Sequence, residues 1–128
     1  MPILKSDKAA PAHVPSEHME QAEFVSWFRK SFAGVRIFAI PNGGHRGQRE
    51  ATRLKVEGVS AGVPDLYIPE WRLWVEMKRT KGSSTSKEQK DWHAYLISIG
   101  DSVVIPKGCE QAIAMVETFR RTVNTSPP

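Results

Sequence analysis

Asp65, Glu76 and Lys78 are the residues whose types and spacing best fit a chemical site. They lie at the ends of the segment 65–78, whose alternating apolar residues predict two short strands joined by a tight turn. If the turn centres on residues 70–71, antiparallel pairing places Asp65 opposite Glu76 and puts Lys78 on the same face. We therefore expect two carboxylates and one ammonium group to share one face of a small sheet.

This arrangement has a chemical consequence, because two carboxylates on neighbouring strands repel each other unless a cation lies between them. Oxygen ligands suit Mg²⁺ or Mn²⁺, whereas zinc favours histidine or cysteine. Such an ion activates water and neutralises phosphate charge, while Lys78 can position that water or stabilise the phosphate oxygens. The set predicts phosphodiester hydrolysis. The alternative is an exposed strand face bearing Glu76 and Lys78, with Asp65 as a turn residue.

The elements that must position these residues follow from hydrophobic periodicity and from capping signals. Ser16 is a candidate N-cap for the first helix, and Thr85 with Glu88 forms a capping-box pattern for the third. Helices are predicted at 17–32, 48–57, 86–99 and 112–119, and strands at 35–40, twice within 65–78, and at 102–105. This order predicts an α/β sandwich with a mixed central sheet flanked by helices, and a right-handed βαβ crossover over 71–105.

Length and composition limit the classes of protein that this chain can belong to. Its 128 residues favour one domain, at 16–123, between disordered tails at 1–15 and 124–128. No apolar run approaches the roughly 18 residues of a membrane span, and the single cysteine excludes an intramolecular disulfide. The net charge of +4 weakly favours polyanionic partners. The N-terminus does not resemble a signal peptide, which predicts a cytoplasmic protein.

Several motifs occur in an order that resembles a known nuclease family. Gly62-Val-Pro-Asp65 followed by Glu76-Met-Lys78 resembles the PD-(D/E)XK nuclease signature. With Pro41-Asn-Gly-Gly44, the basic stretch through Arg53, Ser86, Gln89 with Trp92, and Gly100, the pattern over about residues 16–105 resembles the small stand-alone form of the VRR-NUC family. The resemblance implies a restriction-endonuclease-like sandwich and a Mg²⁺- or Mn²⁺-dependent DNA endonuclease that leaves 5′-phosphates.

The resemblance also bears on substrate and assembly. Stand-alone members resemble Holliday junction resolvases in acting as homodimers, which implies a structure-selective endonuclease of DNA repair or recombination that cuts branched DNA such as four-way junctions. Small members of the family further suggest a phage or prophage source. Two alternatives stay open: a nonspecific or restriction-like duplex nuclease, and a DNA-binding module of a replication or repair complex whose active site is weak or depends on a partner.

Carried over residue by residue, the resemblance gives roles to the motif residues. It makes Asp65 and Glu76 metal ligands, adds the backbone carbonyl of Met77 as a further ligand, and makes Lys78 the catalytic lysine. It also places Gln89 near the active site, although a polar residue in the first turn of a surface helix needs no special role.

The family supplies one more metal-binding glutamate from the first helix, and Glu17, Glu20 and Glu23 compete for that role. We prefer Glu20, which stands four residues before Phe24 and seven before Trp27, at the edge of the buried stripe. Glu17, one turn earlier, is its main rival. Whichever of the two is not the ligand is expected to favour the positive N-terminus of the helix.

The basic segment between the first two predicted strands favours contact with DNA over a solvated loop and helix face. Secondary candidates flank the loop after Lys78. The candidate DNA-binding residues are Asn42, His45, Arg46, Arg49, Arg53, Lys55, Lys81 and Lys87. Trp71 and Trp74 lie near a strand turn, where packing is favoured over base stacking. The histidines, His13, His18, His45 and His93, do not share a metal-ligand spacing.

Overall fold

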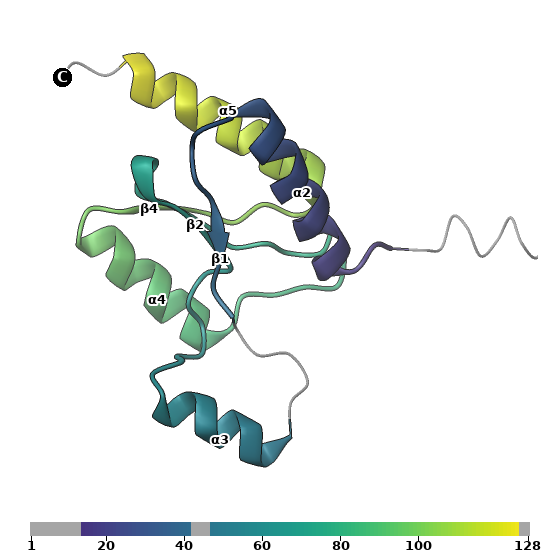
Figure 1. Cartoon of the computed structure of the whole chain (residues 1–128), viewed down its shortest axis with the longest axis vertical. Coiled ribbons are helices and arrows are strands. Elements are labelled where there is room, and N and C mark those ends of the chain that lie inside the picture. Colours follow the sequence, from purple (N-terminus) through teal and green to yellow (C-terminus); the bar gives the residue numbers. More distant parts are fainter. Residues whose placement is uncertain (1–13, 42–46, 126–128) are drawn as a thin grey trace, which may run out of the picture.

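A four-stranded mixed sheet lies at the centre of the structure, a computed structural model that describes residues 14–41 and 47–125 (Figure 1). Its strands, in spatial order, are β1 (Phe38–Ala39), β2 (Leu66–Ile68), β3 (Leu73–Val75) and β4 (Ser102–Val104). The first two pairings are antiparallel, and β3 pairs with β4 in parallel through α4 (Lys87–Ser98). The α/β class predicted from the sequence is confirmed.

The register of the central hairpin is the predicted one. Leu66 pairs with Val75 and Ile68 with Leu73, so the apolar side chains of both strands face the same core. The turn between the strands is a short 3₁₀ helix, η1 (Pro69–Trp71). Leu66 and Val75 form the last pair, so the residue before β2 and the residue after β3 lie at the same end of the hairpin.

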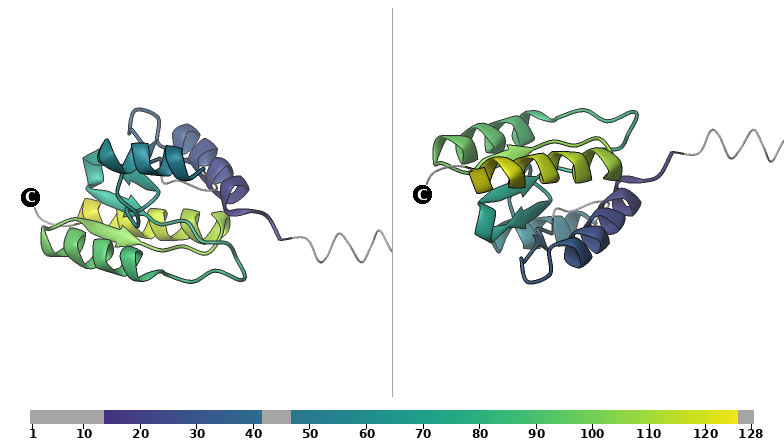
Figure 2. Two further views of the ribbon diagram at one scale, coloured as in Figure 1. Left: turned by 90° about the horizontal axis from the view of Figure 1, so that it is seen from below. Right: turned by 90° about the horizontal axis from the view of Figure 1, so that it is seen from above.

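Helices cover both faces of the sheet. Figure 2 shows α2 (Glu17–Ser31) and α5 (Cys109–Thr125) together on one face and α4 on the other. The remaining described helix, α3 (Gln48–Val56), contains no buried residue and stands out from the body of the molecule in Figure 1. Within the described residues, no helix is long and apolar enough to cross a membrane.

The main core lies between the sheet and the pair formed by α2 and α5. Phe24 and Phe28 of α2 are fully buried, and the ring of Trp71 meets the ring of Phe28 edge-on at 5.4 Å. The packing role predicted for Trp71 is therefore confirmed. The buried apolar residues of this core are Phe24, Phe28, Ile37, Leu66, Ile68, Leu73, Val75, Met77, Cys109, Ala112 and Val116.

Phe28 is expected to be one of the most important residues for stability. We predict that Phe28→Ala lowers the free energy of unfolding by about 3–5 kcal/mol, because a fully buried ring is replaced by a cavity. Val56→Ala, at a side chain that is 83% exposed, is the control and should change it by less than about 0.5 kcal/mol. Urea unfolding measures the free energy of unfolding of both variants. Equally small changes in the two variants would contradict this description of the core.

The N-cap of α4 differs from the prediction by one residue. The pattern Thr85–Glu88 predicted Thr85 as the cap, but Ser86 is the N-cap and Gln89 is its capping-box partner. The Ser86 hydroxyl accepts a hydrogen bond from the Gln89 amide at 3.1 Å, and the Gln89 side chain accepts one from the Ser86 amide at 2.9 Å. Glutamine satisfies the box as well as glutamate does, and the Gln89 side chain is therefore held at the start of α4.

Two other elements differ in length from the sequence prediction. The strand predicted at 35–40 is confined to Phe38–Ala39, the two residues of this segment that pair with β2. The helix predicted at 112–119 covers Cys109–Thr125. It begins earlier because Gly108, at φ 88°, turns the chain directly into it.

Candidate active site

Asp65 and Glu76 face each other where the hairpin strands end. Asp65 directly precedes β2, and its Oδ2 accepts a hydrogen bond from the amide of Met77 at 2.8 Å. Glu76 directly follows β3, where its amide donates to the carbonyl of Val104 at 2.9 Å, and only 1% of its surface is exposed. Hydrogen bonds to the backbone of the sheet thus position both residues. They place the two carboxyl groups close together, with Glu76 buried away from solvent.

The glycine of the Gly62-Val-Pro-Asp65 segment allows the loop before β2 to approach α4. Gly62 has φ +94°, and a Cβ at this position would lie 2.6 Å from the backbone carbon of Glu88. Any side chain here would both strain the backbone and push against the first turn of α4. The glycine therefore brings the loop that carries Asp65 against the helix that carries Gln89.

Burial and the neighbouring Asp65 together raise the pKa of Glu76 to about 9. Burial is the larger cause, and the negative charge of Asp65 and a hydrogen bond between the two carboxyl groups add to it, while Lys78 acts in the opposite direction. A neutral Glu76 therefore shares its proton with Asp65 at neutral pH. The pair carries more negative charge than one lysine can balance if both groups ionise.

The raised pKa of Glu76 predicts how stability depends on pH in EDTA. A group whose pKa is higher in the folded state stabilises the fold below its unfolded pKa, near 4.5, and loses this contribution as the pH rises through about 9. We predict that Glu76→Gln removes this loss and raises the free energy of unfolding at pH 8 by about 1–2 kcal/mol. Urea unfolding at pH 5 and pH 8 tests it; a variant that is less stable at pH 8 would refute it.

Lys78 points its ammonium group into the same cluster and is only 5% exposed. Its Nζ donates to Gln89 Oε1 at 2.7 Å and to the carbonyl of Ser84 at 2.8 Å. Its backbone is held on both sides, since its amide donates to Pro106 O at 3.0 Å and its carbonyl accepts from Gly108 N at 2.9 Å. These contacts hold the cation beside the carboxyl groups.

The first turns of α4 connect the two sides of the cluster. Gln89 Nε2 donates to Glu76 Oε2 at 3.1 Å, while Gln89 Oε1 accepts from Lys78. Only this orientation of the amide is possible, because the Lys78 ammonium and the Ser86 N–H can act only as donors. Gln89 lies between the carboxylate and the lysine and positions both of them.

Sequence reasoning missed His93, which also belongs to this cluster. Its Nε2 lies 3.3 Å from Glu76 Oε1, and the residue is 7% exposed. Burial, followed by the positive charge of Lys78, lowers the pKa of His93, so the ring is neutral at neutral pH. The available signal was its position four residues after Gln89, which places both side chains on one face of the helix. Both Glu76 oxygens are therefore contacted from α4.

The structure separates the two leading glutamates of the first helix. Glu20 is buried, but its Oε1 accepts a hydrogen bond from the amide of Cys109 at 2.9 Å, at the N-terminus of α5. Glu20 was preferred because it lies at the edge of the buried side of α2. In the structure this edge faces the start of α5. Glu17 is close enough to the cluster to respond to its charges: burial and then the charge of Asp65 raise its pKa, and Lys78 lowers it.

The donor chemistry of the cluster fits a divalent cation such as Mg²⁺ or Mn²⁺. Asp65, Glu76 and Glu17 supply only oxygen donors, and because the pKa of Glu76 is raised, a further cation is needed to keep Glu76 ionised at neutral pH. Across residues 14–41 and 47–125, no three His, Cys, Asp or Glu side chains form a complete metal cage. Mg²⁺ commonly binds through one or two carboxylates and keeps several waters, so the residues present fit it.

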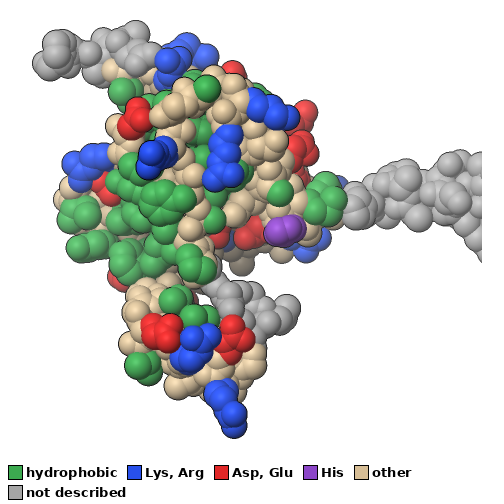
Figure 3. Space-filling model, in the orientation of Figure 1, with side chains coloured by type: hydrophobic (Ala, Val, Ile, Leu, Met, Phe, Trp, Pro, Cys, Tyr) green, Lys and Arg blue, Asp and Glu red, His purple; other side chains and the backbone are tan. Residues whose placement is uncertain are grey.

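The candidate DNA-binding residues are spread over several elements. Arg49, Arg53 and Lys55 lie on α3, where Arg53 pairs with Glu57 at 3.3 Å and every side chain except Leu54 is exposed. Figure 3 shows positive and negative side chains mixed on this projecting helix. Lys81 and Lys87 are exposed on either side of the loop before α4. The candidates Asn42, His45 and Arg46 fall outside the described residues.

Trp74 is held by packing, as its sequence position predicted. Its ring lies 4.2 Å from the ring of Tyr67, centre to centre, and its Nε1 donates to Asp101 at 2.9 Å. The ring is half-buried and has partners on the sheet, so packing accounts for it without base stacking.

Comparison with known proteins supports the fold inferred from this geometry. No family model matches the chain, and no curated protein matches it. Among solved structures, a VRR_NUC domain protein is similar at 26% sequence identity and a TM-score of 0.71, covering 84% of this chain and 89% of that one. The likeness extends over most of both chains, so it concerns the whole domain and not one motif. The chain has the VRR-NUC nuclease fold that its motifs predict.

Proposed function

We propose that the protein is a Mg²⁺- or Mn²⁺-dependent endodeoxyribonuclease that hydrolyses phosphodiester bonds, with selectivity for branched DNA. One observation carries the proposal: the carboxyl groups of Asp65 and Glu76 share a desolvated cluster with the ammonium group of Lys78, on a fold similar to that of a VRR_NUC domain protein. An ion pair that only stabilises the fold needs one carboxyl group beside Lys78. It does not require a second one that is buried and has a pKa of about 9, as Glu76 has, and such strongly shifted groups are typical of functional sites.

The metal is assigned to Asp65 and Glu76, together with the backbone carbonyl of Met77 and with Glu17 from α2. Glu17 replaces Glu20 in this set because its carboxyl group interacts with Asp65, whereas Glu20 accepts from the α5 N-terminus. When bound, a divalent cation would supply Lewis acidity, lowering the pKa of water and balancing charge on the phosphate.

The remaining steps belong to residues of the chain. Lys78 orients the attacking water and stabilises negative charge on the phosphate oxygens as it develops. Gln89 keeps the Lys78 ammonium and the Glu76 carboxylate at a constant separation, and His93 contacts the second oxygen of Glu76. This preorganisation limits the rearrangement needed during the reaction.

Branched-DNA selectivity and a homodimer are proposed together. Residues 14–41 and 47–125 contain one such cluster, and symmetric cuts across a four-way junction need two active sites related by a two-fold axis. The resemblance to small stand-alone VRR-NUC proteins, which resemble junction resolvases, supports this assembly. The proposed setting is DNA repair or recombination, in the cytoplasm of a bacterial or phage-infected cell.

The test compares labelled four-way junction, flap, splayed and plain duplex DNA in Mg²⁺, Mn²⁺ or EDTA, with sedimentation of the protein measured alongside. The proposal expects metal-dependent, symmetric cuts in the junction by a dimer. Equal cutting of every substrate would favour a nonspecific or restriction-like duplex nuclease. Metal-independent binding without cleavage under any metal would leave a DNA-binding module.

A further inference from the structure

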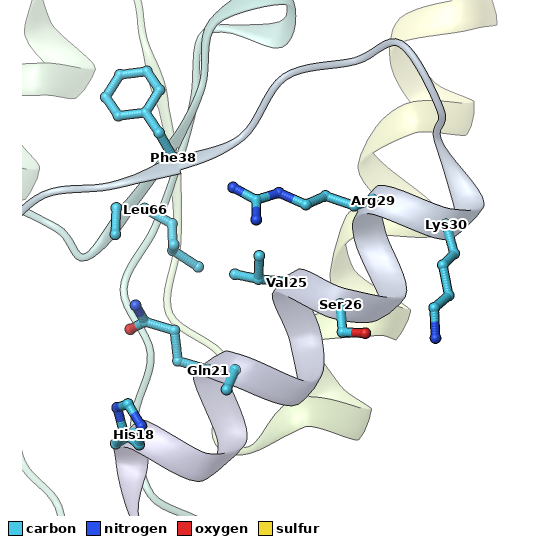
Figure 4. A pocket seen from close by; sticks show the side chains of 10 residues that line it. His18, Gln21, Val25, Ser26, Arg29, Lys30, Phe38 and Leu66 are labelled. Atoms are coloured by element: carbon cyan, nitrogen blue, oxygen red, sulfur yellow. The ribbon is translucent and has the colours of Figure 1, made fainter.

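A groove runs between α2 and the β1 edge of the sheet, and no residue assigned to the cluster lines it. Its volume is about 630 Å³, and its walls include His18, Gln21, Val25, Ser26, Arg29 and Leu66. Figure 4 shows Gln21, Val25 and Arg29 extending from α2 toward the strands that carry Phe38 and Leu66. The larger part of the groove's lining is apolar, and polar and cationic side chains supply the rest.

One end of the groove lies beside the candidate active site. His18 directly follows Glu17, whose carboxyl group is close enough to Asp65 and Lys78 for their charges to act on its pKa, so the wall formed by α2 continues from the cluster. At the other end stand Arg29 and Lys30, and a neighbouring hollow of about 580 Å³ shares Arg29 and adds Arg36. A ligand lying along this groove would extend from the cluster to the end that carries Arg29, Lys30 and Arg36.

The two sides of α2 differ in charge. No acidic side chain lines the groove or the hollow next to it. The hollow on the side of α2 toward α5 is lined by Glu20, Glu23 and Glu110, with Lys107 as its basic residue. This asymmetry on a single helix selects a polyanion for the groove by charge complementarity.

We propose that the groove between α2 and β1 binds the sugar–phosphate backbone of the nucleic-acid strand whose phosphodiester bond lies at the cluster. This inference rests on the proposed function and adds the path of the strand. His18 and Lys30 are twelve residues apart on one helix, about 18 Å, or roughly the axial length of five nucleotides in one strand of B-form DNA.

Arg29 is the anchor of this path. Its guanidinium donates to the carbonyl of Ile37 at 3.2 Å, which fixes the side chain across the groove. A planar guanidinium held in place loses little entropy when it binds a phosphate, and its fork of donors matches phosphate oxygens. Lys30 and Arg36 are exposed and add charge at the same end.

The test measures DNA affinity in EDTA, by fluorescence anisotropy of a labelled single strand over a range of salt concentrations. Lys30→Gln/Arg36→Gln avoids Arg29, whose loss would also release Ile37. The charge-matched control is Lys90→Gln/Arg121→Gln, at exposed positions of α4 and α5. We expect the groove pair to reduce the slope of log affinity against log salt by about 1.4, since each lost phosphate contact on a single strand contributes about 0.7. The control pair should retain the wild-type slope.

Equal losses in the two pairs would overturn the proposal, because net charge alone would then explain binding. A loss confined to Arg49→Gln/Lys55→Gln on α3, with the groove pair binding like wild type, would also overturn it. Cleavage assays separate this inference from the proposed function. A groove-specific loss of binding in a protein that cuts nothing keeps the groove and refutes the nuclease. Metal-dependent cleavage with unchanged KM in the groove pair keeps the nuclease and refutes the groove.

Discussion

Lys78→Met is expected to lower the rate of DNA cleavage by about 10²- to 10³-fold or more, the range for losing one preorganised group that stabilises charge in a transition state. Methionine keeps most of the buried aliphatic stem and removes only the ammonium. Gln89 Oε1 retains the amide of Ser86 as a donor, so the cap of α4 survives. Cleavage rates under single-turnover conditions in Mg²⁺ and Mn²⁺ measure the effect.

Lys90→Met is the matched control, because Lys90 is an exposed lysine of α4 with no assigned contact to the cluster or to DNA. It should cut at a rate close to that of the wild type. Both variants should bind DNA and unfold like the wild type, which separates chemistry from folding. If Lys78→Met cleaved as fast as Lys90→Met, Lys78 would have no catalytic role.

The second large effect should distinguish the two glutamates of α2. Glu17→Gln is expected to weaken metal-dependent cleavage by at least about 10- to 100-fold at limiting metal, since it removes a carboxylate oxygen that faces Asp65. The variant should be no less stable than the wild type, because burial beside Asp65 already raises the pKa of Glu17 and disfavours its charge. A titration of cleavage rate against Mn²⁺ concentration measures the loss.

Glu20→Gln is the paired variant and should behave in the opposite way. It replaces the charge that Glu20 presents to the Cys109 amide at the start of α5, so the free energy of unfolding should fall by about 1 kcal/mol while cleavage at saturating metal is retained. The reverse pattern, with lost cleavage in Glu20→Gln and none in Glu17→Gln, would return the metal-ligand role to Glu20.

The central hairpin could be predicted from the sequence alone. Alternation of apolar residues and a two-residue turn centre leave one register that buries Leu66, Ile68, Leu73 and Val75 together. A slip of one residue would have exposed all four. The same register brings Asp65 opposite Glu76, so local pattern was enough for this part of the candidate site.

The residues contributed by helices could be predicted less well. Gln89 was recognised by resemblance. The N-cap of its helix was not predicted correctly, because Ser86 and Thr85 offer nearly equivalent capping patterns. Its hydrogen bonds to Lys78 and Glu76 were not predicted either. His93 was missed because a single histidine on a helix has no spacing that indicates a partner. Its contact with Glu76 depends on how α4 lies across the sheet.

The sequence by itself determined the order of elements, the hairpin register and the motifs that resemble a VRR-NUC nuclease, since each element, the register and each single motif depend on residues close together in the chain. Only the tertiary structure distinguishes the surroundings of Glu17 and Glu20: Glu20 accepts a hydrogen bond at the start of α5, and the charges of Asp65 and Lys78 act on Glu17. The two are one turn apart and both suit the first turn of a helix, so their roles depend on the rotation of α2 against α5 and the sheet. That rotation is set by the packing of Phe24 and Phe28 against segments distant in the sequence, so it cannot be predicted from a local sequence pattern.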